Sequence, residues 1–512
     1  MEAPRYAGLL VRRLVPALVA LAIAAPAAAA TIHGTPHADA IVGTPAADTI
    51  FAGAGNDLIQ AAFGGVDRVD CGPGRDIVSA DQSDRVAANC EVVSRRLSVD
   101  TTTDPHSQHE TAVEPDSFSW GTTVVAAYQL GRYEGGAASD IGVSVSTNGG
   151  RTWKRTTLPA VTVASTPPGP ELSASDPTVA YDAEHSVWLV GTLTLEQNSS
   201  HLFVARSTDG LHWSAPVDAA TGPELDKDWV ACDNNAASPY RGRCYAEFTD
   251  DAKGTTVSES SDDGGQTWSA PVTASQILVG TQPVVLPNGT LVVVAGNYTD
   301  EHALNGSIVA LRSTDGGATF TRTTIAQLTS AQNGVMRATS LPSVDVDSNG
   351  TIYAVWHDCR FRPGCAENDM VLSTSTDGVT WTAPTRIPLS PVSSTFDAFI
   401  PGLAADPAHP GRLGLVYGFF TPGSCARGAC TLEMGFTMSP DGGRTWTAPQ
   451  RLDAQPMQMS WLAKAEGGRM VGDYFSTSFA GDRVVPVSAL ATSPLAGRFR
   501  EAIFAASLPN VG

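Results

Sequence analysis

Positive charge is scarce in this chain of 512 residues, which has 32 Lys and Arg against 52 Asp and Glu. Its formal charge of −20 disfavours binding to nucleic acid or to an anionic membrane surface. Charged residues make up only 16% of the chain and hydrophobic residues 42%, so the composition is that of a globular protein. A disordered chain, a basic nucleic-acid-binding protein and a coiled coil are therefore excluded.

Motifs of several large enzyme classes are missing as well. The sequence contains no GxSxG, HExxH, P-loop or dinucleotide-binding motif, so it does not support a lipase, a zinc protease or a nucleotide-dependent enzyme. Beyond residue 30 it lacks any segment that is long and apolar enough to span a bilayer. A chain of this length should form more than one domain or one large repeat array.

The first thirty residues have the features of a secretory signal peptide. Three arginines precede an apolar run over residues 14–30, and this run ends in three alanines. Pro16 and Pro26 interrupt the run, which is also short for a membrane span. We therefore expect residues 1–30 to be removed and the mature protein to be secreted.

The cysteines agree with secretion, because eight of them form four pairs at short separations, a pattern typical of local disulfides. The expected pairs are Cys71 with Cys90, Cys232 with Cys244, Cys359 with Cys365, and Cys425 with Cys430. Zinc binding is the competing interpretation, but no CxxC pair has a distant CxxC or HxxxH partner. The sequence favours the disulfides.

Residues 34–90 repeat with a period of about nine residues. Aspartates recur at steps of 9, 9, 10, 9 and 8 residues, and each is followed two residues later by Ile or Val. Glycines permit tight turns with positive φ, the aspartate supplies a hard oxygen ligand, and the apolar residue points into a narrow core. The clearest copy is Ala-Gly-Ala-Gly-Asn-Asp-Leu-Ile at residues 52–59.

This pattern resembles the RTX, or haemolysin-type, nonapeptide repeat, which implies a parallel β-roll with calcium bound between its turns. Under this resemblance residues 31–94 form the roll, and calcium is a structural cofactor. The implied metal ligands are Asp48, Asp57, Asp67 and Asp76. The alternative is a calcium-free roll whose aspartates only cap turns.

A second repeat, which ends in an aromatic residue, occurs six times after residue 95. Its copies cover residues 146–153, 207–213, 261–268, 313–320, 375–381 and 439–446. The terminal aromatic residues are 60, 55, 52, 61 and 65 residues apart, and short Val/Thr/Tyr-rich runs lie between them. This pattern predicts one antiparallel sheet per repeat, with the repeat motif as a hairpin turn. Such sheets close radially into a β-propeller.

The motif S-x-D-x-G-x-x-W resembles the Asp box of BNR-repeat, sialidase-like propellers. The resemblance implies an all-β propeller over residues 95–512, with seven blades favoured and six possible. Three strands remain after the sixth box, and we expect residues 97–101 to supply the missing fourth strand. Sialidases proper have six blades, and many propellers with this box are not sialidases, so the fold alone does not imply the reaction.

Loops in a propeller blade alternate between two faces. The boxes join the third and fourth strands, so they lie opposite the segments that enter each blade, and we expect their aspartates to be structural. Ligands usually bind at the funnel on the other face. The residues expected there include Glu114, Asp116, Arg132, Asp176, Asp226, Lys227, Asp228, Tyr298, Arg337, Arg360, Asp473 and Tyr474.

Sialidase chemistry needs arginines that bind the substrate carboxylate, a tyrosine nucleophile and an aspartate acid. The resemblance assigns the ligand-binding role to Arg132, Arg337 and Arg360. It assigns the catalytic roles to Tyr474, Asp116 and Asp176. The family's Arg-Ile-Pro motif is missing near the first blade, and no glutamate partner for the tyrosine can be named.

The expected protein is thus a secreted, sialidase-like propeller that engages an extracellular glycan or glycoprotein, with exo-glycosidase activity of the sialidase type. The alternative is a non-catalytic propeller for adhesion or protein binding. Clustered arginines and a buried tyrosine–carboxylate pair in the funnel would distinguish the enzyme. No nucleic acid and no membrane span are expected, and a monomer is favoured.

Overall fold

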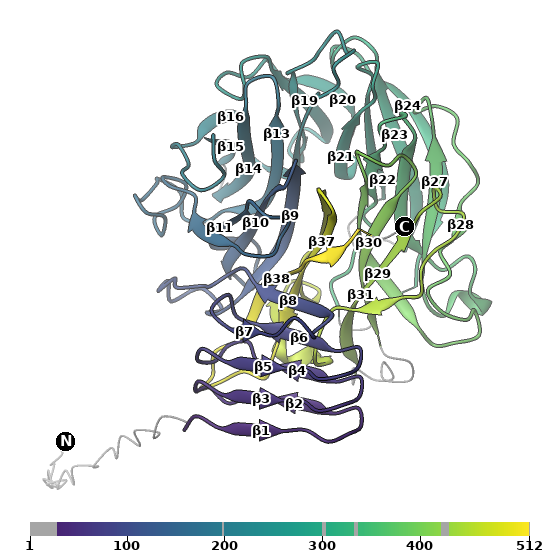
Figure 1. Cartoon of the computed structure of the whole chain (residues 1–512). Helices are drawn as coiled ribbons and strands as arrows, with labels where there is room; N and C mark the ends of the chain where they lie inside the picture. The colour runs from purple at the N-terminus through teal and green to yellow at the C-terminus, as the bar shows by residue number, and fades with distance from the viewer. Residues whose placement is uncertain (1–27, 197–198, 299–303, 332–335, 421–429, 511–512) are drawn as a thin grey trace, which may run out of the picture.

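The chain is almost entirely β-structure in the computed structural model, which describes residues 28–196, 199–298, 304–331, 336–420 and 430–510. A parallel β-roll is stacked against one side of a β-propeller (Figure 1). The expected all-β class, the propeller and the N-terminal roll are confirmed. The expected signal peptide lies outside the described residues except for residues 28–30. Among the described residues, no helix has the length and apolar character needed to cross a membrane.

The roll consists of two short parallel sheets. One contains β1 (Thr31–His33), β3 (Thr49–Phe51), β5 (Arg68–Asp70) and β7 (Arg85–Val86). The other contains β2 (Ala40–Val42), β4 (Leu58–Gln60), β6 (Ile77–Ala80) and β8 (Val92–Arg96). Successive repeats alternate between the two sheets, so one coil of the roll contains two repeats. In most repeats the apolar residue two positions after the aspartate is buried between the sheets, as in Ile50, Ile59, Val69 and Val78.

Six propeller blades are antiparallel meanders of four consecutive strands. The first two contain β9 (Ala112–Trp120), β10 (Thr123–Arg132), β11 (Ala138–Ser146) and β12 (Lys154–Thr157), then β13 (Ser175–Asp182), β14 (Val187–Glu196), β15 (Ser199–Ser207) and β16 (Val217–Gly222). The next two contain β17 (Leu225–Cys232), β18 (Cys244–Asp250), β19 (Thr255–Ser261) and β20 (Val272–Gln276), then β21 (Val279–Val285), β22 (Leu291–Asn297), β23 (Asn305–Ser313) and β24 (Thr321–Thr329). The last two contain β25 (Ser343–Val346), β26 (Ile352–Asp358), β27 (Asp369–Ser375) and β28 (Thr385–Arg386), then β29 (Asp397–Ala405), β30 (Leu413–Phe420), β31 (Thr431–Ser439) and β32 (Gln450–Arg451).

The ring is closed by a sheet that both ends of the chain build. β36 (Ser476–Ala480), β37 (Arg483–Ala491) and β38 (Glu501–Ala506) form a meander, and β8 of the roll pairs with β38 as its outer strand. The innermost strands contact one another in a closed circle, β9–β13–β17–β21–β25–β29–β36. The propeller therefore has six self-contained blades, and a composite sheet fills the remaining place in the ring.

The closing strand differs from the one expected at residues 97–101. The segment that pairs is Val92–Arg96, because its parallel pairing with β6 already fixes it at the end of the roll, beside β38. Leu97 only adds a backbone hydrogen bond to Ile503.

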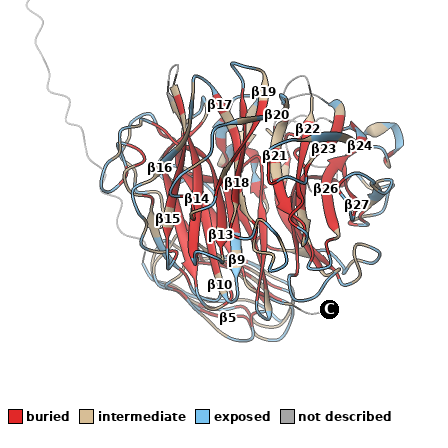
Figure 2. Ribbon diagram, turned by 90° about the horizontal axis from the view of Figure 1, so that it is seen from above, coloured by how far each residue is buried: buried red, intermediate tan, exposed pale blue. Residues whose placement is uncertain are grey.

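Short elements complete the structure. β33 (Met457–Gln458) pairs with β31, β34 (Ala463–Ala465) and β35 (Gly468–Met470) form a hairpin, and β39 (Leu508–Pro509) pairs with β37. Two 3₁₀ turns cover Pro363–Cys365 and Met459–Trp461. Seen from above, the blade strands are buried along most of their length, since each blade packs between two neighbours (Figure 2).

Three of the four expected disulfides are present. They join Cys71 with Cys90, Cys232 with Cys244, and Cys359 with Cys365. The first links two coils of the roll, the second links the first two strands of blade 3, and the third closes a loop after β26. The expected pair of Cys425 with Cys430 involves Cys425, which lies outside the described residues.

Because β8 belongs both to the roll and to the composite sheet, we expect a substitution that destabilises this sheet of the roll to destabilise the propeller as well. All 10 tryptophans lie at or after Trp120, so tryptophan fluorescence reports on the propeller alone. Val78 is buried in the sheet that continues into β38, whereas Val69 is equally buried in the sheet confined to the roll. Val78→Ala should lower the free energy of unfolding by about 2 kcal/mol. It should therefore lower the urea midpoint that tryptophan fluorescence detects. Val69→Ala should lower it much less, and equal effects would contradict coupling through β8.

Candidate functional site

The funnel mouth is shaped by a distortion repeated in the innermost strands. Near the start of β9, β13, β17, β21 and β29 the pairing register shifts, as in a β-bulge. A residue with positive φ marks each shift: Glu114 (52°), Asp176 (47°), Lys227 (54°), Gly280 (65°) and Ile400 (52°). Residues other than glycine rarely adopt this conformation, and such strain concentrates at functional sites. Bulges also redirect side chains, here at the entrances of five blades.

Three of these residues, Glu114, Asp176 and Lys227, line one polar cavity of about 370 Å³. Its other polar wall residues are Arg132, Ser175, Asp226, Thr249, Asp251, Tyr298 and Arg337. A second, much smaller pocket of about 20 Å³ shares Asp176 and Lys227 with it. That pocket also contains Asp228, Trp229, Asp473 and Tyr474. Residues from blade entrances that are distant in sequence thus line one site.

Glu114 is a buried carboxyl group that lines this cavity. Its side chain is buried, and its Oε2 accepts a hydrogen bond from Gln129 Nε2. Burial, followed by the charges of Asp176 and Asp473, raises the pKa of Glu114 to about 8. The carboxyl group is therefore protonated at neutral pH, which is the state required of a general acid.

Asp176 is held as a hydrogen-bond acceptor next to this acid. Ser175 Oγ donates to its Oδ1 at 3.0 Å, and the backbone N–H of Lys227 donates to its Oδ2 with a distance of 3.3 Å. The side chain lines both the large and the small pocket. Both oxygens of this carboxyl group therefore accept hydrogen bonds.

Lys227 and Arg337 both bind Asp473. Lys227 Nζ lies 2.6 Å from Asp473 Oδ2, while Arg337 Nη2 and Nε lie 2.8 and 3.0 Å from Oδ2 and Oδ1. Although burial opposes ionisation, these two cations hold the pKa of Asp473 far below its ordinary value. The ion cluster connects blade 3, the segment before blade 5 and the composite sheet across the channel.

Arg132 contributes a further guanidinium to the cavity. Its Nη1 donates to Gln129 Oε1 at 2.8 Å, and its Nε is buried without a hydrogen-bond partner. Arg132 and Arg337 line the same cavity, and their role as ligands of a substrate carboxylate stays a prediction. Arg360 instead binds Asp358 with two contacts of 2.9 and 2.6 Å, and it is not among the described residues that line this cavity.

Tyr474 lies in the smaller pocket, and its hydroxyl is already hydrogen-bonded. The hydroxyl donates to Pro177 O at 3.2 Å, and the ring meets Trp229 edge-on at 5.3 Å. Burial, and then the carboxyl groups of Glu114 and Asp176, raise the pKa of Tyr474 well above its ordinary value. Ionisation of this hydroxyl is therefore unfavourable, and its assignment as a nucleophile stays a prediction.

Asp116 has a different environment from Asp176. Its Oδ2 accepts the backbone N–H of Val179 at 2.7 Å, which joins β9 to β13. Burial raises the pKa of Asp116 to about 7. Among the described residues, Asp116 is not part of the wall of either pocket. Its predicted role as an acid therefore has less geometric support than that of Asp176.

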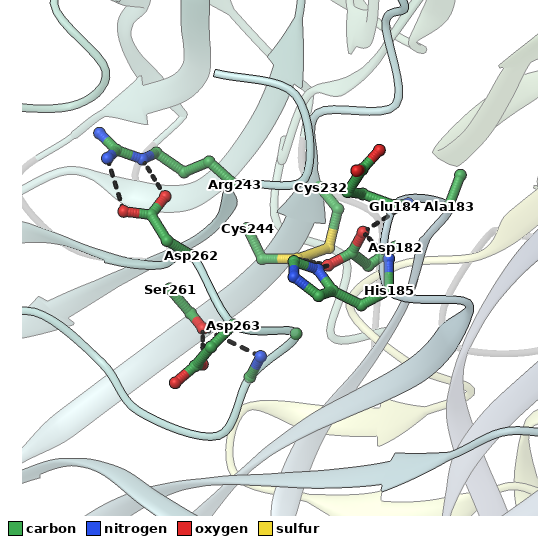
Figure 3. A network of polar contacts seen from close by, with 12 residues as sticks. Asp182, Ala183, Glu184, His185, Cys232, Arg243, Cys244, Ser261, Asp262 and Asp263 are labelled. Carbon is green, nitrogen blue, oxygen red and sulfur yellow. Dashed lines mark hydrogen bonds and ion pairs between the residues drawn. A yellow bond between two sulfur atoms is a disulfide. The ribbon is translucent and has the colours of Figure 1, made fainter.

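The six Ser-x-Asp or Ser-x-Asn turns use their side chains for local structure. In the turn at residues 261–268, Ser261 Oγ accepts the N–H of Gly265, and Asp263 Oδ1 accepts those of Gln266 and Thr267, each at 2.9 Å. Although burial opposes it, hydrogen bonds, above all those from Thr267, lower the pKa of Asp263 to about 2. Figure 3 shows this turn near the Cys232–Cys244 disulfide.

The roll aspartates form a second acidic group. The Oδ1 of Asp67 accepts the backbone N–H of Asp48 at 2.7 Å, one coil earlier, and the Oδ1 of Asp76 accepts that of Asp57 at 2.8 Å. The Oδ2 atoms of Asp57, Asp67 and Asp76 are buried without a hydrogen-bond partner. Burial, and then the charges of nearby aspartates, raise the pKa of Asp67 to about 6.

Sequence reasoning missed two features of the site. Gln129 contacts both Glu114 and Arg132, but a neutral amide within a strand gives no signal in the sequence. The bulges do leave a signal: a proline follows the strained residue in Glu114-Pro115, Asp176-Pro177 and Ile400-Pro401. Such pairs are easily read as ordinary turn formers, yet here they recur at blade entrances.

Family models match two parts of the sequence. Residues 122–346 match the BNR repeat-like domain, and residues 33–65 match the RTX calcium-binding nonapeptide repeat. The chain combines a BNR repeat-like domain with RTX calcium-binding repeats. Both resemblances drawn from the sequence are therefore confirmed. No curated protein sequence is significantly similar to this chain.

Several solved structures are weakly similar to the chain. An ulvan lyase, a polysaccharide lyase, is 11% identical with a TM-score of 0.46, and the match covers 79% of this chain and 95% of that one. The intramolecular trans-sialidase from Ruminococcus gnavus is 15% identical with a TM-score of 0.35, over 75% and 90% of the two chains. A protein of unknown function from Dyadobacter fermentans DSM 18053 is 13% identical with a TM-score of 0.43, over 78% and 95%. Likeness at this level transfers neither a substrate nor a mechanism.

The buried acid predicts a pH-dependent stability. Because the pKa of Glu114 rises from 4.5 to about 8 on folding, the folded protein keeps a proton that the unfolded chain releases. The resulting stabilisation is complete below about pH 4.5 and is lost as the pH rises through about 8. Glu114→Gln should therefore raise the thermal midpoint at pH 8 relative to wild type and leave it similar at pH 4.

Scanning fluorimetry across this pH range measures the effect. The matched control is Glu134→Gln, because the side chain of Glu134 is 64% exposed, and its midpoint should run parallel to that of the wild type. A parallel curve for Glu114→Gln as well would contradict a buried, protonated Glu114.

Proposed function

We propose that the protein is a secreted, glycan-active enzyme that cleaves a glycosidic bond in the cavity at the propeller mouth. One observation carries this proposal: Glu114 and Asp176 line the same cavity, one as a buried protonated acid and the other as a carboxyl group that accepts hydrogen bonds. Glycoside hydrolysis needs such a pair with separate protonation states. The expected signal peptide and the local disulfides support secretion.

The two carboxyl groups have complementary roles. Glu114 donates its proton to the glycosidic oxygen as the bond to the anomeric carbon breaks. Asp176 removes a proton from a water molecule, whose oxygen bonds to that carbon. The proton on Asp176 then returns to Glu114 through solvent, which restores the starting state.

The cations of the cavity favour an acidic sugar as substrate. Arg132 has a buried Nε–H without a partner, and Lys227 and Arg337 lie in the same wall. A guanidinium pairs well with a carboxylate, as found on sialic or uronic acid residues. A sialidase-type activity is the finer form of this proposal, with Arg132 and Arg337 as carboxylate ligands.

A non-catalytic, glycan-binding propeller is the second candidate. It is favoured by the ion cluster, in which Lys227 and Arg337 are already paired with Asp473. Cations paired in this way bind a substrate carboxylate less strongly, which suits weak, reversible recognition.

Hydrolysis of a panel of fluorogenic sialosides and uronides by the mature protein tests the proposal. Glu114→Gln should lower kcat at least 100-fold, because it removes the transferable proton and keeps the shape of the side chain. Tyr474→Phe separates two reactions: a comparable loss would indicate a tyrosine nucleophile, whereas activity within a few-fold of wild type would support the two carboxyl groups.

The controls use residues away from the cavity. Asp263→Asn should lower stability and leave kcat unchanged, since Asp263 serves only its own turn. Full activity of Glu114→Gln would refute the proposed acid. No turnover of any substrate by the wild type, together with binding of the same glycans, would favour the non-catalytic candidate.

The roll aspartates also fit calcium, whose preferred ligands are carboxylate and carbonyl oxygens. An ideal Cβ position on Gly43 lies 3.3 Å from Asp48 Oδ2, 3.4 Å from Gln60 O and 3.7 Å from Asp67 Oδ2. No three acidic, His or Cys side chains of the described chain converge on one metal position, so main-chain oxygens would complete such a site. A bound cation would offset both the desolvation cost of these buried carboxyl groups and the repulsion between neighbouring aspartates.

Calcium titration of chelator-treated protein by calorimetry tests this assignment. Calcium should raise the thermal midpoint, and Asp67→Asn should weaken binding about tenfold or more because it removes one charged ligand. The control is Asp70→Asn, since Asp70 is partly exposed and bonds Asn89 at the surface of the roll. Absence of calcium binding by the wild type would mean that the aspartates only cap turns.

A further inference from the structure

Gln129 lies behind both carboxyl groups of the proposed reaction. It is fully buried on β10, and its amide oxygen accepts a hydrogen bond from Arg132 Nη1 at 2.8 Å. Its amide nitrogen donates to Glu114 Oε2 and to Ser175 Oγ, the latter at 3.1 Å. Ser175 Oγ in turn donates to Asp176 Oδ1 at 3.0 Å. One amide thus reaches the acid directly and the base through a hydroxyl group.

The direction of these hydrogen bonds follows from the chemistry of the partners. A guanidinium can only donate, so the amide oxygen of Gln129 must face Arg132. Both N–H groups of the amide then point toward Glu114 and Ser175. Because Glu114 Oε2 receives an N–H donor, this oxygen serves as the acceptor, and the carboxyl proton belongs on Oε1. Asp176 Oδ1 is likewise fixed as an acceptor by the hydroxyl of Ser175.

We infer that Gln129 is a positioning residue of the proposed glycosidic cleavage: it holds Glu114 with the proton on Oε1 and, through Ser175, holds Asp176 as the acceptor. This inference rests on the proposed function and adds a residue to it. Gln129 acts through these two side chains and is not itself a member of the cavity wall among the described residues.

Several other groups act on the titration of Glu114 and must stay unchanged in a test. The charged or titratable groups that face it are Asp176 on β13, Asp473 before β36, Arg132 on β10, Lys227 on β17, and Tyr474. Their combined field, with burial, sets the baseline pKa, and the N–H of Gln129 stabilises the ionised form of Glu114 in addition.

Gln129→Met removes that N–H without adding a charge. The variant keeps an unbranched side chain of similar length, but it offers no donor to Glu114 and no strong acceptor to Arg132. Loss of a donor to the ionised form raises the pKa of Glu114. The alkaline limb of the pH–kcat profile, where the acid loses its proton, should therefore move upward by about one pH unit. We expect kcat to fall at least tenfold and KM to change less than threefold, because positioning acts on the reaction step.

Tyr128→Phe is the matched control. Tyr128 is the neighbour of Gln129 on β10, is equally buried, and its hydroxyl bonds Ser144. Its loss should lower stability without moving the alkaline limb. A limb that moves equally in both variants, or in neither, would overturn the inference.

A second measurement needs neither a substrate nor a folded variant at position 129. In the ¹⁵N spectrum of the wild type, the side-chain amide of Gln129 should shift with pH at the midpoint of Glu114, and Glu114→Gln should abolish this step. An amide signal that ignores pH would overturn the positioning role. Activity that survives in Glu114→Gln would instead refute the proposed acid. The pH dependence of the Gln129 amide signal in the wild type would still report on the hydrogen bond between Gln129 and Glu114.

Discussion

Completion of the composite sheet depends on the backbone hydrogen bonds between β8 and β38. They align Ser94 to Arg96 of the roll with Phe504 to Ala506 at the other end of the chain. Without them β38 would be an exposed sheet edge, and the composite sheet would lack its outer strand. Ser94 Oγ donates to Leu452 O at 2.7 Å, which is a further contact between the roll and the propeller, and Arg96 pairs with Asp81 at 2.6 Å within the roll. The roll is thus part of the propeller ring and not an appended module.

The same closed ring makes the charged cavity possible. Strained residues such as Glu114, Asp176 and Lys227 lie at blade entrances in a conformation that costs about 1–3 kcal/mol each. Buried carboxyl groups add a desolvation cost, which is only partly offset by the pairing of Asp473 with Lys227 and Arg337. A ring of interlocked sheets can hold such a group in place. The buried environment keeps Glu114 protonated beside Asp176, which accepts hydrogen bonds.

Repeats made most of the fold predictable from the sequence. Two local motifs repeat along the chain: aspartates spaced by about nine residues and turns with an aromatic residue spaced by about sixty. Each copy of a motif indicates the same backbone geometry. The sequence places Glu114, Asp176, Lys227 and Arg337 at blade entrances, and in the structure these residues line one cavity. The finer contacts of this cavity were not predictable, because they depend on which neighbours the folded chain supplies.

Particular residues show this limit. Arg360 fits an arginine cluster by sequence, but Asp358, two residues earlier, binds it. Gln129 carries no charge and lies within a strand, so only the bulge at Glu114 and the proximity of Arg132 give it a role. The closing strand was misplaced by a few residues because its position is set by the register of the roll and not by local sequence.

Joining the first part of the chain to the last also has a consequence for folding kinetics. Ser98 Oγ and Ile503 N, which bond at 2.8 Å beside the junction, are 405 residues apart. Contacts between such distant segments form late, since the entropy of closing a long loop must be met before they contribute. During synthesis the roll and the six blades can form in order, while the outer edge of β8 stays unpaired until β38 has been made. The composite sheet is therefore completed only after Glu501–Ala506 has been synthesised.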